Sequence, residues 1–234
     1  MNAASPNGVT VVLVHGAWAD GSSWARVIPH LLDKNIPVVA IQNPTSSLAD
    51  DVAATERAMA SIKGPIVLVG HSWGGTVITE AGNDPRVKGL VYVAALAPGA
   101  GESTGDLVSS HPAPPTLGKI QDDGRGYLKL SPEAWIEDVA NDLPASEVRI
   151  LATVQPPLPT STFGDKITKA AWQTRPSWYV VATDDRAVSV ELQAELAKRL
   201  KAKTTELKAS HLLILSKHRE VADVIIDAVK SVTA

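Results

Sequence analysis

The sequence predicts an α/β protein with a mostly parallel, doubly wound sheet of about six strands and an inserted cap. Short apolar runs alternate along the chain with longer segments of helical periodicity. Such alternation is typical of parallel strands joined by right-handed helical crossovers. The buried strand runs are apolar at successive positions, which indicates that helices cover both faces of the sheet. One long proline-rich stretch breaks the alternation and indicates an insertion.

Each element is expected from its local pattern. Residues 9–14 are continuously apolar and β-branched, as in a strand buried on both faces. Residues 23–33 carry apolar side chains at helical spacing, which predicts a helix. In chain order the other expected elements are a strand at 37–41, a helix at 48–62, a strand at 66–69, a sharp turn at 70–75 that enters a helical run, strands at 87–93 and 177–182, a helix at 190–200, a short strand at 203–207 and an amphipathic helix at 219–229.

Residues 98–165 are expected to form the cap. This stretch holds nine of the 16 prolines, and a structureless loop of this length is uncommon in a compact domain. Ser131 is a candidate N-cap for a helical patch at 132–136. A disordered insertion is the alternative, but apolar side chains such as Trp135 offer surface to pack. The prediction is therefore a core of residues 1–97 and 166–234 with a cap or lid over the strand ends.

Composition excludes several classes of protein. The 234 residues include no cysteine, which excludes disulfide scaffolds, thiolate metal sites and cysteine nucleophiles. The formal net charge of −3 gives no basic excess for nucleic acid or an anionic membrane, so neither is an expected partner. No apolar run approaches the roughly 20 residues that span a membrane. No signal peptide precedes Val9, so we expect a cytoplasmic protein as given, or a periplasmic or secreted one if a leader was removed.

The strongest chemical signal is a G-x-S-x-G motif over residues 70–74, centred on Ser72. It directly follows an apolar strand and directly precedes a helical run, which is the context that a nucleophilic serine requires. Small residues at Gly70 and Gly74 let neighbouring backbone approach closely. A merely tight turn is the alternative reading. We expect Ser72 to be a nucleophile.

A serine hydroxyl needs a base to take its proton, and in this architecture the acid and the histidine follow the serine along the chain. His211 lies just after the last short strand and is the expected base, although a structural histidine in a loop is the alternative. The other five histidines fit less well: His15 and His71 lie within turns, His30 on an early helix, His111 in the cap and His218 at the start of the final helix.

The acid is expected at the carboxyl end of the strand at 177–182. Asp184 and Asp185 both lie there, and adjacent residues point in different directions, so one of them should reach the imidazole. Developing negative charge on the substrate needs preorganised donors. The backbone N–H groups of Trp73, after the nucleophile, and Ala17, in the loop after the first strand, are the candidates for this oxyanion hole. Trp18 either lines the pocket or packs on the first helix.

These motifs together resemble the α/β-hydrolase superfamily, and most closely the small bacterial α/β-hydrolases of the alpha/beta hydrolase-6 type, often described as esterases. The resemblance implies the α/β-hydrolase fold and selects Asp185 as the acid, because that family places it directly before a basic residue. Val188 and Ser189 replace a usual proline pair, and Trp73 replaces a common tyrosine. The cap resembles the family least. The likeness rests on residues 11–18, 42–51, 70–75, 80–85, 177–186 and 210–211.

The resemblance implies a serine hydrolase, specifically a carboxylesterase that cleaves small carboxylic esters with Ser72, His211 and Asp185. Related proteins use the same residues as cofactor-free haloperoxidases or perhydrolases, thioesterases or lactonases. A noncatalytic ligand-binding homologue is a further alternative. No metal or organic cofactor is expected, since no metal-binding or nucleotide-binding motif is present. The expected partner is a small-molecule ester, and the chain is expected to be a monomer or homodimer.

Overall fold

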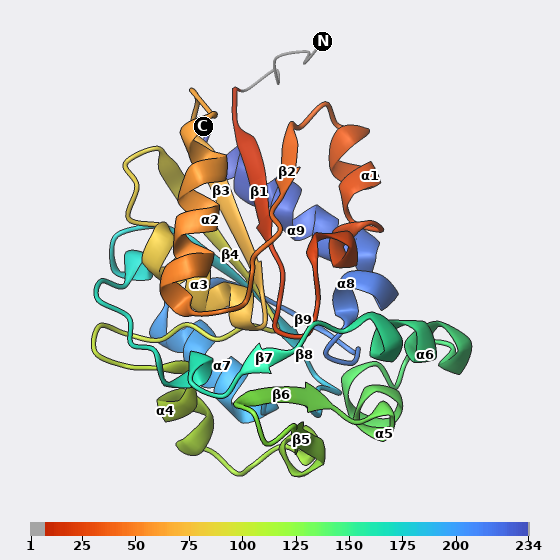
Figure 1. The fold of residues 1–234 in the computed structure, drawn as a ribbon. Coiled ribbons are helices and arrows are strands. Elements are labelled where there is room, and N and C mark those ends of the chain that lie inside the picture. Colours follow the sequence, from red (N-terminus) through yellow and green to blue (C-terminus); the bar gives the residue numbers. More distant parts are fainter. Residues whose placement is uncertain (1–7, 234) are drawn as a thin grey trace.

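The computed structural model describes residues 8–233, so residues 1–7 and 234 of the predicted core lie outside the described residues. Residues 8–233 contain a six-stranded parallel sheet in the order β2-β1-β3-β4-β8-β9 (Figure 1). This confirms the predicted parallel α/β sheet. The strands are β1 (Thr10–Val14), β2 (Val38–Ala40), β3 (Ile66–His71), β4 (Val87–Val93), β8 (Ser177–Ala182) and β9 (Lys203–Leu207).

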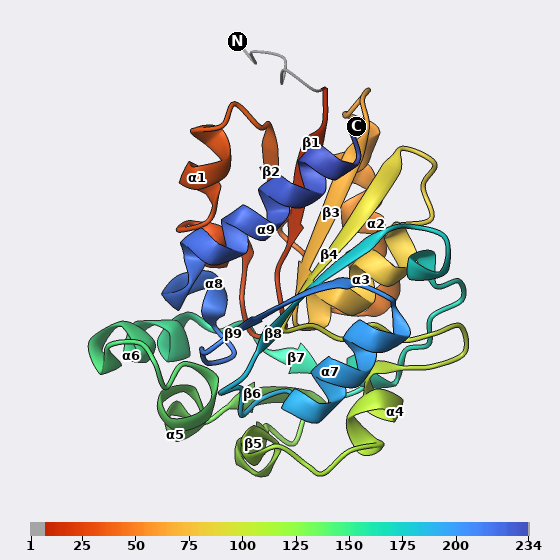
Figure 2. The same cartoon turned by 180° about the vertical axis from the view of Figure 1, so that it is seen from behind.

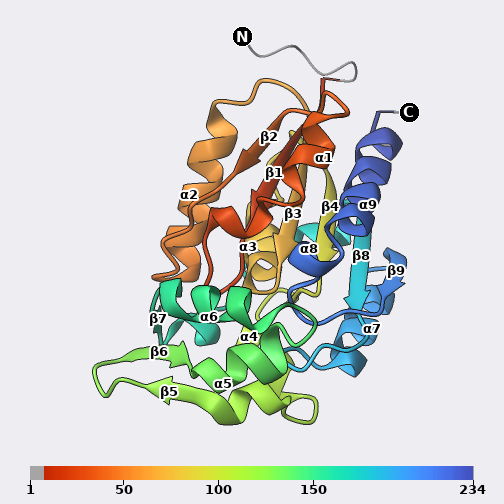
Figure 3. The same ribbon diagram turned by 90° about the vertical axis from the view of Figure 1, so that its right-hand side faces the viewer.

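Helices cover both faces of the sheet and create two hydrophobic cores. Successive strand side chains point to opposite faces, so Val11 and Leu13 pack in one core while Val12 and Val14 pack in the other. Figure 2 shows α9 crossing one face, and Figure 3 shows α2 and α3 on the opposite side. The first face carries α1 (Ile28–Leu32), α8 (Leu213–Ser216) and α9 (His218–Ser231), and the second carries α2 (Leu48–Ala60), α3 (Trp73–Ala81) and α7 (Val190–Arg199).

The prediction of a single helix at residues 23–33 is wrong. The structure has a 3₁₀ turn, η1 (Gly21–Trp24), and then the short α1, which starts at Ile28. Pro29 lies at the beginning of α1 and has no backbone N–H, so it is tolerated only in the first turn of a helix. An α-helix running from residue 23 through Pro29 would lose a hydrogen bond in its interior.

The chain between β4 and β8 forms a separate layer at one end of the sheet (Figure 3). Its antiparallel sheet, β5-β6-β7, was not expected from the weak local patterns. Ser131 caps the helix that follows it, since its hydroxyl accepts a hydrogen bond from the Ala134 amide at 3.1 Å. The exact cap limits of 98 and 165 stay a prediction. The layer contains α4 (Thr104–Ser109), η2 (Pro115–Lys119), β5 (Ile120–Asp122), β6 (Tyr127–Leu130), α5 (Pro132–Ala134), the π-helical turn η3 (Trp135–Val139), α6 (Ala145–Val154), β7 (Leu158–Pro159) and η4 (Thr162–Gly164). The next element, η5 (Ala171–Gln173), packs beside α3 in the core.

The topology gathers four loops at the carboxyl edge of the sheet. Parallel strands end at the same edge, so the loops after β1, β3, β8 and β9 open toward one another and toward the cap (Figure 1). These loops carry all the residues expected to act in catalysis. Within residues 8–233, no helix is long and apolar enough to cross a membrane.

Candidate active site

Ser72 lies at the sharp turn between β3 and α3 in a backbone conformation that few non-glycine residues adopt. Its φ is 53° and its ψ is −122°. Such strained backbone persists where the surroundings hold it, and it is frequent at functional sites. The Ser72 carbonyl accepts hydrogen bonds from the amides of Gly75 at 2.9 Å and Leu96 at 3.2 Å. The turn is therefore fixed from two sides while the Ser72 hydroxyl points away from the sheet.

The glycines of the motif are required by close backbone contacts. A Cβ atom on Gly70 would lie 2.4 Å from the Gly74 carbonyl oxygen, and one on Gly74 would lie 2.4 Å from the Val14 carbonyl oxygen. Backbone atoms have little freedom to move aside, so a side chain at either position would displace β1 or the serine turn. The two glycines thus allow the strand, the turn and the first loop to meet at Ser72.

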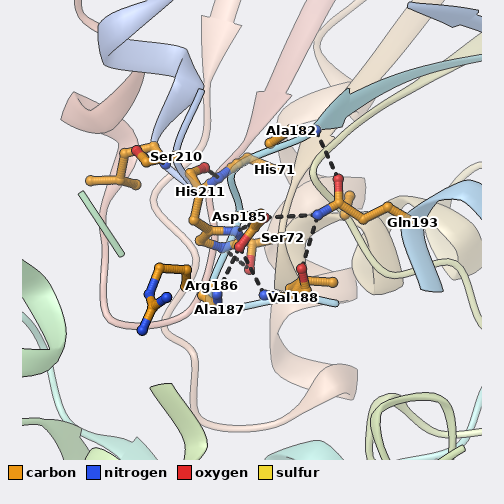
Figure 4. Close-up of polar contacts among 12 residues, drawn as sticks. His71, Ser72, Ala182, Asp185, Arg186, Ala187, Val188, Gln193, Ser210 and His211 are labelled. Carbon is orange, nitrogen blue, oxygen red and sulfur yellow. Dashed lines mark hydrogen bonds and ion pairs between the residues drawn. The ribbon is translucent and has the colours of Figure 1, made fainter. Parts of the chain in front are cut away.

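The structure brings Ser72, His211 and Asp185 into one hydrogen-bonded chain (Figure 4). The Ser72 Oγ lies 2.9 Å from His211 Nε2, and His211 Nδ1 lies 2.7 Å from Asp185 Oδ2. A carboxylate only accepts hydrogen bonds, so Nδ1 carries the proton and Nε2 is free to accept one from the serine. His211 is 6% exposed, and the Asp185 side chain is fully covered. This is the arrangement in which a histidine can activate a serine.

Asp185 is held by hydrogen bonds to both of its carboxylate oxygens. Oδ1 accepts from the amides of Ala187 at 2.7 Å and Val188 at 2.9 Å, and Oδ2 accepts from His211 and from Gln193 Nε2 at 2.8 Å. These donors satisfy both oxygens of a buried carboxyl group and fix its orientation toward His211. Asp184, in contrast, is exposed, and its amide bonds to the Ala209 carbonyl at 3.1 Å. Of the two adjacent aspartates, Asp185 is therefore the one that reaches the imidazole.

Gln193 on α7 is a site residue that the sequence pattern does not single out. It is fully buried, and its Nε2 also donates to the Val188 carbonyl at 3.1 Å. Its Oε1 accepts from the Ala182 amide at 3.0 Å, so every polar atom of the side chain is used at the end of β8 (Figure 4). The only signal in the sequence is a polar residue in the otherwise apolar stripe of this helix.

His71 and His15 both support the site as neutral imidazoles. His71 Nε2 donates to the His211 carbonyl at 2.8 Å, and burial, reinforced by the nearby His211, lowers the pKa of His71 to about 3. His15 Nδ1 donates to the Gly16 carbonyl at 2.8 Å, while its Nε2 accepts from the Asn43 amide at 3.0 Å. Burial also lowers the pKa of His15. The His71 ring therefore holds the backbone at His211, and the His15 ring holds the backbone of the loop after β1. Neither ring serves as the catalytic base.

The predicted oxyanion donors lie beside the serine. The Ala17 and Trp73 side chains and Ser72 line the same cavity, and a Cβ atom on Gly16 would lie 3.0 Å from the Cβ of Ser72. Among residues 8–233, neither the Ala17 amide nor the Trp73 amide donates a hydrogen bond to a protein acceptor. Two unpaired N–H groups next to a nucleophile are free to bind a developing negative charge.

The cavity above Ser72 is small and mostly apolar. Its volume is about 170 Å³, and the cap and the core both contribute to its walls. Phe163 of the cap makes edge-to-face contacts with Trp18 and Trp73, at centroid distances of 5.8 and 5.9 Å. The Trp18 indole also donates to the Leu128 carbonyl at 3.0 Å, so Trp18 both lines the pocket and ties the core to the cap.

A buried carboxylate holds the Trp73 side chain. Asp51 Oδ2 accepts from the Trp73 indole at 2.7 Å, and Asp51 Oδ1 accepts from the Thr45 amide at 2.7 Å. Burial raises the pKa of Asp51 to about 6, although both hydrogen bonds oppose the rise. Within the part of the chain that the structure describes, no group of three or more histidine or acidic side chains could hold a metal ion.

Comparisons with known proteins identify the family and the fold of the chain. A model of the alpha/beta hydrolase family matches residues 11–224. The probable hydrolase R7 of a Phoma species is 25% identical over 92% of this chain and 96% of its own. The alpha/beta hydrolase nvfD of Aspergillus novofumigatus is 27% identical over 81% of this chain and 83% of its own.

Solved structures with the same fold cover nearly the whole chain. A pyrethroid hydrolase from Sphingobium faniae superimposes with a TM-score of 0.81 at 22% identity, over 95% of this chain and 98% of that one. Polyneuridine aldehyde esterase, as an H244A mutant, superimposes with a TM-score of 0.80 at 19% identity, over 94% and 98% of the two chains. At these identities the likeness shows the fold.

Proposed function

This chain belongs to the alpha/beta hydrolase family, and we propose that it is a serine hydrolase that cleaves small carboxylic esters through an acyl-enzyme. The observation that carries the proposal is the hydrogen-bonded chain from Ser72 through His211 to Asp185, which ends at an apolar cavity beside two unpaired backbone amides. The structural relatives that are named an esterase and a pyrethroid hydrolase support an ester as the substrate class.

In the first half of the proposed reaction, Ser72 Oγ attacks the ester carbonyl while His211 Nε2 takes its proton. The 2.9 Å separation of these atoms is within the range for proton transfer. Asp185 keeps the proton on Nδ1 and stabilises the imidazolium that forms. The Ala17 and Trp73 amides bind the oxygen that becomes negative. The imidazolium then protonates the leaving alcohol, which leaves an acyl group on Ser72.

In the second half, water takes the place of the alcohol. His211 removes a proton from the water as the water attacks the acyl carbonyl, and the same two amides hold the oxyanion. The collapse of this second intermediate returns the proton to Ser72 and releases the carboxylic acid. Both halves use the same base and the same oxyanion donors, so no further group is required.

The size of the cavity favours a small substrate. Pockets that enclose drug-sized ligands usually have volumes of about 300–1,000 Å³, whereas this one measures about 170 Å³. Trp18, Trp73 and Phe163 wall it with rigid rings. We therefore propose a short acyl group as the preferred one.

The test is turnover of p-nitrophenyl esters of increasing acyl length by the wild type and by Ser72→Ala. We expect the acetate and butyrate to be hydrolysed fastest, and the alanine variant to lose several orders of magnitude in kcat. A wild type without burst or turnover, or a variant with undiminished turnover, would contradict the proposal and favour a ligand-binding homologue. Thioesters, lactones, and peroxide added as a second acceptor would distinguish the related activities.

A matched pair of variants tests the acid. Asp185→Asn should lower kcat by roughly 10⁴, because an amide cannot hold the same histidine tautomer. Asp184→Asn changes the adjacent exposed aspartate and should retain at least half of the activity. The reverse order would show that the acid has been assigned to the wrong residue.

A further inference from the structure

We propose that the cap residue Asp142 is a positioning residue for the base, so that the cap helps to build the active site as well as to cover it. This inference rests on the proposed function, because it assigns a role in the reaction of Ser72 and His211. Asp142 lies in the loop between η3 and α6 and is exposed. It does not line the cavity, so any effect on catalysis has to pass through the residues that it binds.

The Asp142 carboxylate binds the residue directly before His211. Its Oδ2 accepts from the Ser210 amide at 2.9 Å, and its Oδ1 accepts from the Ser210 hydroxyl at 2.5 Å. Oδ2 also accepts from the Ser216 hydroxyl at 2.7 Å, on the short helix α8 that follows the base. One side chain from the cap therefore binds the chain both before His211, at Ser210, and after it, at Ser216.

Two more contacts extend this hold. The Ser210 hydroxyl, bound by Asp142, accepts from the Leu212 amide at 3.2 Å. The Leu212 amide also donates to the Val139 carbonyl at 3.2 Å, at the end of the π-helical turn η3. π-Helical turns are rare in proteins, and those that occur often lie at functional sites. This one places a cap carbonyl against the loop that carries His211. Ser210, His211 and Leu212 are all buried, so these polar groups depend on protein partners.

The cap also holds the loop of the acid, through different residues. The buried Asp138 of η3 binds Arg186 Nε at 2.8 Å and Lys119 Nζ at 2.6 Å. Burial opposes ionisation of Asp138, but these two cations outweigh it and hold the pKa of Asp138 below its usual value. The Arg186 carbonyl accepts from the Thr116 amide at 3.2 Å and the Thr116 hydroxyl at 2.9 Å. The cap thus reaches the neighbours of both His211 and Asp185.

This hold bears on catalysis because proton transfer is sensitive to small displacements. A shift of about 1 Å in a catalytic group can cost about 100-fold in rate. The core holds His211 through His71 and Asp185, at its carbonyl and its ring. Asp142 adds a constraint at Ser210, in the loop that joins β9 to His211. Without it, the Ser210 amide and hydroxyl lose their acceptor.

The test compares Asp142→Ala with Asp142→Asn and with Asp123→Ala. Asp123 is a matched control, because it is an exposed cap aspartate whose Oδ1 accepts from two backbone amides, those of Arg125 at 2.7 Å and Tyr127 at 3.0 Å. Asp142→Ala should lower kcat for p-nitrophenyl acetate by about 10- to 100-fold, with KM within about twofold of the wild type. Asp142→Asn keeps one acceptor oxygen and should recover most of kcat. Asp123→Ala should behave as the wild type.

A second readout does not depend on turnover. The His211 ring signals, assigned with a His211→Gln variant, can be followed by NMR from pH 5 to pH 9 in each protein. Asp142→Ala should shift these signals and their titration midpoint, and Asp123→Ala should not. If the wild type hydrolyses esters and Asp142→Ala keeps full kcat, the inference is overturned while the proposed function stands. If the wild type has no activity, the proposed function fails, and unchanged His211 signals would overturn the inference separately.

Discussion

Replacing His71 with glutamine should make the protein markedly less sensitive to acid. His71 is buried beneath the base, and its Nε2 donates to the His211 carbonyl at 2.8 Å. A glutamine amide at this position can still donate to that carbonyl, but it has no proton to gain. The substitution thus separates the ionisation of His71 from its hydrogen bond.

The magnitude follows from the pKa. Burial lowers the pKa of His71 from 6.5 to about 3 in the folded protein. Between these values the unfolded chain binds a proton that the folded protein does not, so stability rises with pH across this window. The contribution is fully present above pH 6.5 and is lost as the pH falls toward 3. At pH 4.5 the loss amounts to about 2–3 kcal/mol.

The assay is urea unfolding, followed by tryptophan fluorescence, at pH 7.5 and pH 4.5. The fall in the free energy of unfolding between these values should be about 2–3 kcal/mol smaller for His71→Gln than for the wild type. Val77→Ala is the control, because it removes buried apolar atoms from α3, the helix that begins two residues after His71, and changes no ionisable group. It should lower stability equally at both pH values. An equal fall for His71→Gln and the wild type would refute the reasoning.

Three further predictions concern residues that support the site. Burial raises the pKa of Asp51 to about 6, so its contribution to stability falls as pH rises from about 4 to 6. Between pH 4.5 and pH 7.5, the range of the urea assay, this fall amounts to about 2 kcal/mol, and Asp51→Asn should remove it. Gln193→Leu leaves the Ala182 amide without its acceptor and should cost about 2–4 kcal/mol of stability, with kcat at least tenfold lower; wild-type stability would contradict this. Gly74→Ala should cost at least about 3 kcal/mol, because the new Cβ would lie 2.4 Å from the Val14 carbonyl oxygen. Gly118→Ala, in open space, should stay within about 0.5 kcal/mol of the wild type.

The centre of the parallel sheet was predictable because β1, β3 and β8 are mostly apolar runs, a pattern that depends on local sequence. Residues 87–93, 177–182 and 203–207 match β4, β8 and β9. The helix expected at 23–33 failed because its apolar spacing was given more weight than Pro29. The cap sheet has short strands without a strong pattern, and the only local signal was the turn between β5 and β6, where Gly124 and Gly126 have positive φ.

The residues of the active site also differ in how far the sequence alone predicts them. Ser72 stands in a motif with a defined strand-to-helix context, and His211 follows from chain order, so both could be found in sequence. The choice of Asp185 over Asp184 needed the family resemblance, because sequence alone does not show which of two neighbours faces the imidazole.

Gln193 and Asp142 could not be found from sequence. Their roles depend on contacts with residues 8 and 68 positions away, Asp185 and Ser210, and no local pattern encodes such contacts.

The most direct test of the central claim is to trap the acyl-enzyme. The protein would be mixed with p-nitrophenyl butyrate, quenched in acid within the burst and analysed by intact-protein and peptide mass spectrometry. We predict a mass increase of one butyryl group on the peptide that contains Ser72, absent from Ser72→Ala and accumulating in Asp185→Asn only at a greatly reduced rate. An ester-hydrolysing wild type that carries no adduct at Ser72, or carries it on another residue, would contradict the account.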